Sequence, residues 1–151
     1  RSFSAFIGRE LSTQKVVIKN NTEHHLDEGF VCRVGELALD YLEEVRKDFS
    51  VYFVYGKEIK KLNKEYFGSN KETDILSFPS EFTLSDYLGE LIINLDLISE
   101  KKQQEQRDEI VYLIAHGVLH LLGYDHINTK EGEYMRVKEM ALIKRILEVL
   151  N

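Results

Sequence analysis

The sequence predicts an α+β fold, in which a mixed four-stranded sheet packs with about four to five helices. Short runs rich in β-branched and aromatic residues alternate with segments whose apolar residues recur every three or four positions. No internal repeat or linker divides the 151 residues, so we expect residues 1–151 to form a single domain. A hydrophobic content of 43%, with 11% aromatic residues, suffices for one buried core.

Four segments are predicted strands. Residues 15–19 (KVVIK) form a β-branched run that ends at two asparagines. Residues 51–55 (VYFVY) are β-branched or aromatic throughout, which is typical of a buried strand. The third strand spans residues 73–78 and stops at Pro79, because proline cannot donate to a ladder. Residues 88–94 (LGELIIN) are the fourth.

Four segments are predicted helices. Apolar residues recur with helical spacing over residues 27–47 and 57–67. We expect one long helix over about residues 99–122, followed by a last helix. Asn128 and Glu131 resemble a capping box at the start of this last helix. Its predicted buried stripe consists of Met135, Leu142, Ile146 and Val149.

Residues 115–126 (AHGVLHLLGYDH) contain three of the five histidines. His116 and His120, four residues apart on a helix, project from one face, where two imidazoles can bind one ion. Gly123 permits the left-handed conformation that ends a helix, so His126 can return to the same ion. We predict a site of three imidazoles with a fourth position for water or substrate, as in catalytic zinc sites. Imidazole also suits nickel, copper and iron; zinc is the default interpretation.

The histidine spacing is similar to that of the metzincin zinc peptidases, H-E-x-x-H-x-x-G-x-x-H, and predicts a metzincin-like histidine helix. In those peptidases the glutamate is the general base that takes a proton from water on the metal. Gly117 occupies this position here. Ordinary peptidase chemistry therefore lacks its base, and a peptidase would need a carboxylate from elsewhere in the chain.

The string HGVLHLLGYDH also closely resembles the signature of the YbeY family, metal-dependent endoribonucleases of bacterial ribosomal RNA maturation. Residues 62–79 (LNKEYFGSNKETDILSFP) resemble a second family block, L-N-x-x-Y-R followed by T-D-V-L-S-F-P. The segment LGELII is similar to the family's L-G-D-I, with Glu90 in place of Asp, and Met135 and Glu139 match downstream. The chain is identified as a member of this family on these blocks.

This resemblance implies a single-strand-specific metallo-endoribonuclease that acts in 3′ end maturation of small-subunit (16S) rRNA and in ribosome quality control. It implies one zinc ion on His116, His120 and His126, completed by water. The implied partners are single-stranded rRNA and the ribosome or its small subunit. Two alternatives stay open: a zinc metallopeptidase-like hydrolase with a relocated base, and a non-enzymatic ribosome-associated module whose metal is structural. A fourth protein ligand would favour the module.

One position departs from the family pattern. The family usually has an arginine after the tyrosine of its L-N-x-x-Y-R block, where this chain has Phe67. An arginine there could bind a phosphate through two parallel hydrogen bonds, which phenylalanine cannot do. Lys64, one turn earlier, or Lys71, in the following loop, could act instead as a point charge on an RNA phosphate.

Three further residues are candidates for catalytic roles. Asp125 follows the glycine bend and precedes the third histidine. It either accepts the second N–H of a ligand histidine and fixes its tautomer, the interpretation we favour, or handles a proton. Asp74 and Ser77 belong to the second family block and could shape the cleft or hold a substrate group. Helix capping and strand packing are equally good explanations for both.

Charge and composition bear on partners and compartment. The net charge of −6 is unusual for an enzyme of nucleic acids, so RNA binding requires a local positive patch. Candidate groups are Lys57, Lys60, Lys61 and Lys64 on one predicted helix and Lys101, Lys102 and Arg107 before the histidines. A single cysteine excludes an internal disulfide, and no apolar run approaches the length of a membrane span. We expect a cytoplasmic protein without a membrane partner. The sequence leaves its oligomeric state open.

Overall fold

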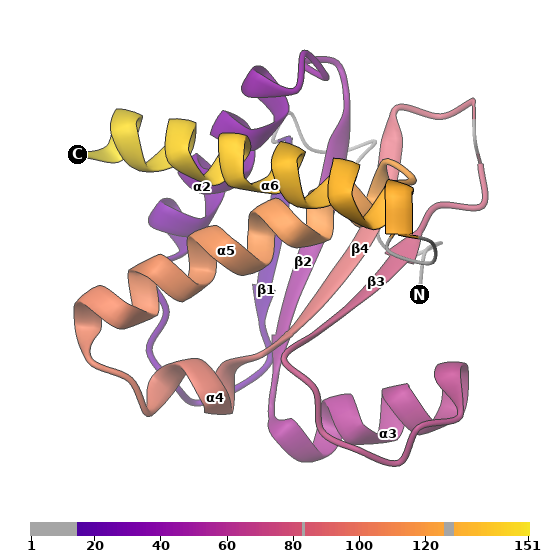
Figure 1. Ribbon diagram of the computed structural model, residues 1–151. Coiled ribbons are helices and arrows are strands. Elements are labelled where there is room, and N and C mark those ends of the chain that lie inside the picture. Colours follow the sequence, from indigo (N-terminus) through magenta and orange to yellow (C-terminus); the bar gives the residue numbers. More distant parts are fainter. Residues whose placement is uncertain (1–14, 83, 126–128) are drawn as a thin grey trace.

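The computed structural model describes residues 15–82, 84–125 and 129–151, which form four strands and five helices (Figure 1). The strands are β1 (Val16–Asn20), β2 (Asp48–Val54), β3 (Ile75–Pro79) and β4 (Tyr87–Asn94). The helices are α2 (Glu28–Tyr41), α3 (Gly56–Phe67), α4 (Leu95–Ser99), α5 (Gln103–Leu121) and α6 (Thr129–Leu150). The predicted α+β class with a mixed four-stranded sheet is confirmed.

The strands lie in the order β1-β2-β4-β3. Strands β1, β2 and β4 are parallel, whereas β3 runs antiparallel to β4 at one edge of the sheet. Gly89 in β4 has a φ of +131°, and a Cβ there would lie 2.2 Å from the carbonyl oxygen of Phe78. Only glycine allows the two backbones to approach this closely, which accounts for the glycine in the LGELII segment.

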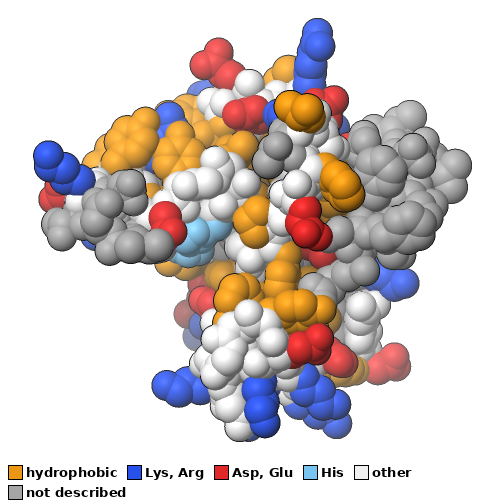
Figure 2. Space-filling model, turned by 90° about the vertical axis from the view of Figure 1, so that its right-hand side faces the viewer, with side chains coloured by type: hydrophobic (Ala, Val, Ile, Leu, Met, Phe, Trp, Pro, Cys, Tyr) orange, Lys and Arg blue, Asp and Glu red, His pale blue; other side chains and the backbone are white. Residues whose placement is uncertain are grey.

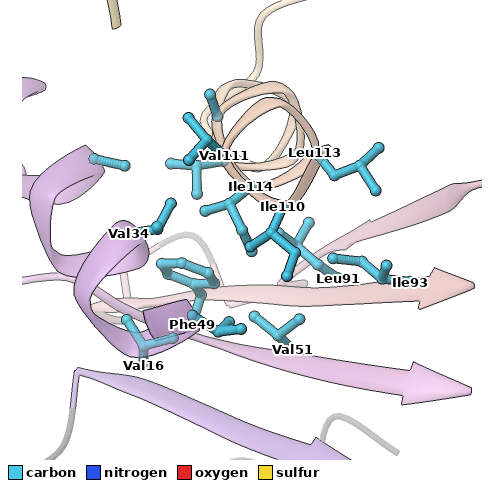
Figure 3. Packing of buried hydrophobic residues seen from close by; sticks show 14 of the residues in the cluster. Val16, Val34, Phe49, Val51, Leu91, Ile93, Ile110, Val111, Leu113 and Ile114 are labelled. Atoms are coloured by element: carbon cyan, nitrogen blue, oxygen red, sulfur yellow. The ribbon is translucent and has the colours of Figure 1, made fainter. Parts of the chain in front are cut away.

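Helices α2, α5 and α6 cover one face of the sheet and enclose the main core (Figure 1). Figure 3 shows Phe49 of β2 and Leu91 of β4 packed beneath Ile110 and Ile114 of α5, with Val34 of α2 beside them. Phe49, Leu91 and Ile114 are completely buried. Burial of this apolar surface fixes α5, the helix that carries the paired histidines, against the sheet.

Helix α3 packs on the face of the sheet opposite to α2, α5 and α6 (Figure 1). A smaller cluster of Val54, Ile59, Leu76 and Ile92 is buried beneath it. Alternation along the edge strand β3 turns Leu76 and Phe78 toward α3, while Ile75 packs against the main core. Strand β3 therefore separates the α5 side of the molecule from the α3 side.

Two predicted helices have different boundaries in the structure. The helix predicted over residues 27–47 ends at Tyr41, because Glu43 takes a left-handed φ of 59°. No glycine marks this turn, so the apolar spacing that continues beyond it was misleading. The helix predicted over about residues 99–122 is α5, which begins four residues later, at Gln103; the short helix α4, which ends at Ser99, was not predicted.

The reason for the second error lies in the caps. The side-chain oxygen of Asn94 accepts a hydrogen bond from the backbone N–H of Asp96, at 3.1 Å, and begins α4 directly after β4. The Glu105 carboxylate accepts one from the backbone N–H of Lys102, at 3.2 Å, and begins α5. The capping box predicted for Asn128 and the side chain of Glu131 lies outside the described residues.

The predicted buried stripe of the last helix is largely confirmed. Met135, Leu142 and Ile146 are completely buried in the main core, whereas Val149 is half-buried near the helix end. Within the described residues, none of the helices combines the length and apolar character needed to cross a membrane.

Candidate metal centre

The paired histidines occupy the last two turns of α5, one turn apart on the same face. The Nε2 atoms of His116 and His120 lie 3.1 Å apart, and both side chains are half-buried. Two nitrogens bound to one tetrahedral zinc, each at about 2.0–2.1 Å from it, lie about 3.3 Å from each other. The two rings share one face of the helix, as the spacing predicted, and their separation suits two ligands of one ion.

Glu139 on α6 orients the first histidine. Its carboxylate lies 2.5 Å from Nδ1 of His116, and the two side chains are only 13% and 18% exposed. When Nδ1–H is donated to Glu139, the Nε2 lone pair of His116 faces His120 and is available to a cation. Carboxylates commonly support metal-binding histidines in this way.

The sequence assigned this supporting role to Asp125 and noted Glu139 only as part of a motif. A signal for Glu139 existed in its position. It lies one helical turn after Met135 on the buried side of α6, where an unpaired acid would be costly. Asp125 is half-buried in the segment after Gly123.

The chain reverses after α5 as the sequence predicted. Gly123 has a φ of +98°, and its N–H donates to the carbonyl of His120 at 3.0 Å. The predicted third ligand, His126, lies outside the described residues. Within the described ranges, no group of three or more His, Cys, Asp or Glu is placed to hold an ion. The described part of the site thus consists of two imidazoles and the Glu139 carboxylate.

Gly117 faces the sheet, where α5 lies closest to it. A Cβ at this position would be 2.7 Å from both methyl carbons of Leu91 and 3.0 Å from Cδ1 of Ile75. A glutamate in the position of the metzincin base would have to displace these two packed side chains. The close contact between helix and sheet gives a structural reason for the glycine.

Tyr112 also belongs to this site, although the sequence did not predict it. Its ring stacks on His116, with the ring centroids 5.8 Å apart, and the residue is 40% exposed. Burial raises the pKa of its phenol, and the carboxylates of Glu139 and Asp74 raise it further. Tyr112 therefore offers an O–H donor beside the histidines. Its spacing of one turn from His116 was the available signal.

Asp74 immediately precedes β3 and Ser77 lies within it; both are half-buried. The carboxylate of Asp74 contributes to the raised pKa of Tyr112. The backbone carbonyl of Asp74 accepts a hydrogen bond from Asn94, at 2.9 Å, which holds the start of β3. Ser77, two residues after Ile75, is on the same face of the strand.

Lys64 and Lys71 are on the other side of β3. Both are exposed, Lys64 on α3 and Lys71 in the loop that follows it. The side-chain amide of the buried Asn63 donates to the carbonyl of Lys71 at 3.1 Å and holds this loop against the helix. The described contacts do not bring either lysine to the histidine pair.

Most, but not all, of the basic side chains predicted to form a positive patch are exposed on the surface. All four lysines of α3 are exposed, as are Lys101 and Lys102. Arg107 instead places its guanidinium over the ring of Phe30 on α2, 4.1 Å from the centroid. Figure 2 shows a histidine surface near the middle of one face, hydrophobic side chains below it, and positive side chains around the lowest part.

Comparison with known proteins agrees with these features. A model of the family "Endoribonuclease YbeY" matches residues 12–147. The endoribonuclease YbeY of Aliarcobacter butzleri is 41% identical over 133 residues, which cover 85% of this chain and 89% of that protein. The endoribonuclease YbeY of Mycoplasma mobile is 32% identical over 142 residues, which cover 88% of this chain and 91% of that protein.

A solved structure has a similar fold. The solution structure of TM1509 from Thermotoga maritima matches with a TM-score of 0.62 and 23% sequence identity. The match covers 89% of this chain and 91% of that one. The fold, the histidine pair and the sequence matches lead to one conclusion: the chain belongs to the YbeY family of endoribonucleases.

Proposed function

We propose that this chain is a single-domain, metal-dependent endoribonuclease that cleaves single-stranded RNA. Its proposed substrate is the 3′ end region of small-subunit (16S) rRNA, on the small subunit or the ribosome in the cytoplasm, with a role in ribosome quality control. Family membership supports the reaction. The observation that carries the proposal is the His116–His120 pair, whose Nε2 atoms are 3.1 Å apart and whose first ring is oriented by Glu139.

We assign one zinc ion to His116, His120 and His126, with water in the remaining position. Zinc there would supply Lewis acidity toward a phosphate oxygen and toward water. The Glu139 carboxylate accepts a hydrogen bond from Nδ1–H of His116 and thereby holds this proton on Nδ1. The other ring nitrogen, Nε2, then keeps its lone pair for the metal. The donor set suits the ion, because neutral imidazole nitrogens are ligands that zinc prefers.

Several residues around this site can act on the RNA. Asp125, beside the third proposed ligand, and Asp74, immediately before β3, are the carboxylates we assign to proton transfer or ligand support. Ser77 shapes the cleft along β3. Tyr112 can donate its phenolic O–H to a phosphate oxygen, since its raised pKa keeps the proton in place at neutral pH.

A substrate assay separates the candidate functions. Protein with defined metal content is incubated with single-stranded rRNA and with an unfolded protein, each with and without chelator. We expect chelator-sensitive cleavage of the RNA alone. Cleavage of the unfolded protein alone would favour the peptidase alternative with a relocated base. Intact RNA in the presence of bound metal would favour the non-enzymatic ribosome-associated module.

Replacement of Glu139 by glutamine is expected to weaken zinc binding by about 10- to 100-fold, as for other supporting carboxylates. The amide keeps the shape of the side chain but loses the charge that holds the Nδ1 proton of His116. Competition with a chromophoric chelator measures the affinity. Glu148→Gln, on the exposed face of the same helix, is the matched control and should bind zinc normally. Equal zinc affinity in the two variants would show that Glu139 does not support metal binding.

Replacement of Asp125 by asparagine distinguishes its two roles. A supporting role predicts loss of zinc affinity by about 10-fold or more, with cleavage restored at high zinc. A role in proton transfer predicts normal zinc content and a loss of cleavage of about 100-fold or more. Metal analysis and single-turnover cleavage, performed on the same preparation, measure both quantities. We expect the first pattern; normal zinc content together with normal cleavage would exclude both roles.

A further inference from the structure

Three aromatic side chains meet where the end of α3 approaches the edge strand β3. The ring of Phe78 on β3 contacts Tyr66 edge to face, with centroids 5.3 Å apart, and lies 5.6 Å from Phe67. Tyr66 is 47% exposed and Phe67 is 55% exposed. We refer to Tyr66, Phe67 and Phe78 as the aromatic wedge. Exposed aromatic area that is gathered in one place indicates a binding surface.

The wedge is held by the fold. Phe78 packs against the cluster beneath α3, so its position is fixed by the sheet. Helix α3 ends immediately after Phe67, where Gly68 takes a left-handed φ of 70°. The Asn63 amide then ties the following loop to the helix through the carbonyl of Lys71. The exposed ring faces are thus presented without a large ordering cost on binding.

Positive charge adjoins these rings. Lys64 precedes Phe67 by one helical turn, and Lys71 lies in the loop that Asn63 holds. Glu65 and Glu72 are also exposed nearby. Within the part of the chain that the structure describes, neither lysine forms an ion pair with a carboxylate. Flat apolar ring faces beside ammonium groups complement a nucleotide, because its base is planar and its phosphate is negatively charged.

The location suits a strand of RNA that also reaches the histidines. In the described sheet, β3 is an edge strand whose outer side pairs with no other strand. Ile75, the first residue of β3, packs beside Gly117, the neighbour of His116, and Phe78 follows three residues later. At about 3.3 Å per residue, this separation is roughly 10 Å. Figure 2 shows histidine, hydrophobic and positive side chains on one face of the molecule.

We propose that the aromatic wedge is a stacking platform for an unpaired RNA base, and that Lys64 and Lys71 contact the adjoining phosphates. Phe67 would contribute base stacking through its exposed ring. This inference rests on the proposed function, because it takes single-stranded RNA as the ligand. It adds a specificity element, since a stacking platform accepts only bases that are not paired in a duplex.

The test uses a short single-stranded oligoribonucleotide that contains 2-aminopurine, whose fluorescence is quenched by stacking. Binding is measured in chelator, so that the RNA stays intact. Phe67→Ala should weaken binding by about 5- to 150-fold, which corresponds to about 1–3 kcal/mol per stacked base at 1.4 kcal/mol per tenfold. It should also abolish the quenching. Phe67→Trp should retain both, because tryptophan offers a larger ring face.

Two controls separate stacking from other effects. Phe67→Leu keeps apolar bulk without an aromatic face and should behave like Phe67→Ala. Val137→Ala removes an apolar side chain of α6 that is 67% exposed, and this variant should bind RNA normally. The lysines are tested by salt dependence: Lys64→Ala and Lys71→Ala should each lower the slope of log affinity against log salt by about 0.7.

The outcomes also separate this inference from the proposed function. Normal affinity and quenching in Phe67→Ala, in a protein that still cleaves RNA, would overturn the platform alone. Wild-type binding by Phe67→Leu would overturn stacking in favour of simple apolar contact. A defect of Phe67→Ala in binding the small subunit, without one for naked RNA, would identify a protein-docking surface and also overturn it. Quenching by wild type without RNA cleavage would support the platform while the proposed reaction failed.

Discussion

Replacement of His116 by alanine is expected to abolish metal binding and to lower RNA cleavage by at least about 1,000-fold. The Nε2 atom of His116 is 3.1 Å from that of His120, so one missing imidazole leaves the ion without half of the described ligand pair. A bound metal ion is typically worth several kcal/mol in the transition state, and each 1.4 kcal/mol is tenfold in rate. Metal analysis and cleavage of single-stranded rRNA measure the two losses.

His120→Ala should have the same effect as His116→Ala. His25→Ala is the matched control, because this exposed histidine lies in the loop between β1 and α2 and should leave both quantities unchanged. Circular dichroism should show normal helix content in all three variants, since both paired histidines are only half-buried. A metal-free His116→Ala protein with undiminished cleavage would refute the metal centre.

Replacement of Gly117 by glutamate should lower the free energy of unfolding by about 2–6 kcal/mol, and it should not create a peptidase. A Cβ would already lie 2.7 Å from the methyl carbons of Leu91, which is completely buried. Overpacking typically costs about 1–3 kcal/mol, and burial of a polar group without a partner adds about 1–3 kcal/mol. For a chain of this size, the expected fall in Tm is about 4–24 °C.

Alanine substitutions at two glycines provide the control for this prediction. Gly29 in the first turn of α2 has room for a Cβ, whose nearest contact would be 3.5 Å away. Gly29→Ala should therefore raise the free energy of unfolding by about 0.5–1 kcal/mol through helix propensity. Gly117→Ala should show no such gain. A Gly117→Glu protein as stable as the wild type would disprove the packing argument.

Local patterns predicted the elements whose signals lie within a few residues. Gly68 and Gly123 mark turns because each takes a positive φ that other residues rarely adopt. The error at Tyr41 has the same origin, since the left-handed residue there is Glu43, which carries no such signal. The starts of α4 and α5 depend on caps formed by Asn94 and Glu105, which apolar periodicity does not detect.

The sequence by itself determined the pairing of His116 with His120, because residues four apart on a helix are neighbours whatever surrounds them. Only the tertiary structure decided which residues support that pair. Glu139 reaches His116 from another helix, and Gly117 is required by strands far away in the chain. The aromatic wedge likewise joins Phe67 to Phe78 across two elements. Such contacts depend on how the elements pack, and no local spacing encodes that packing.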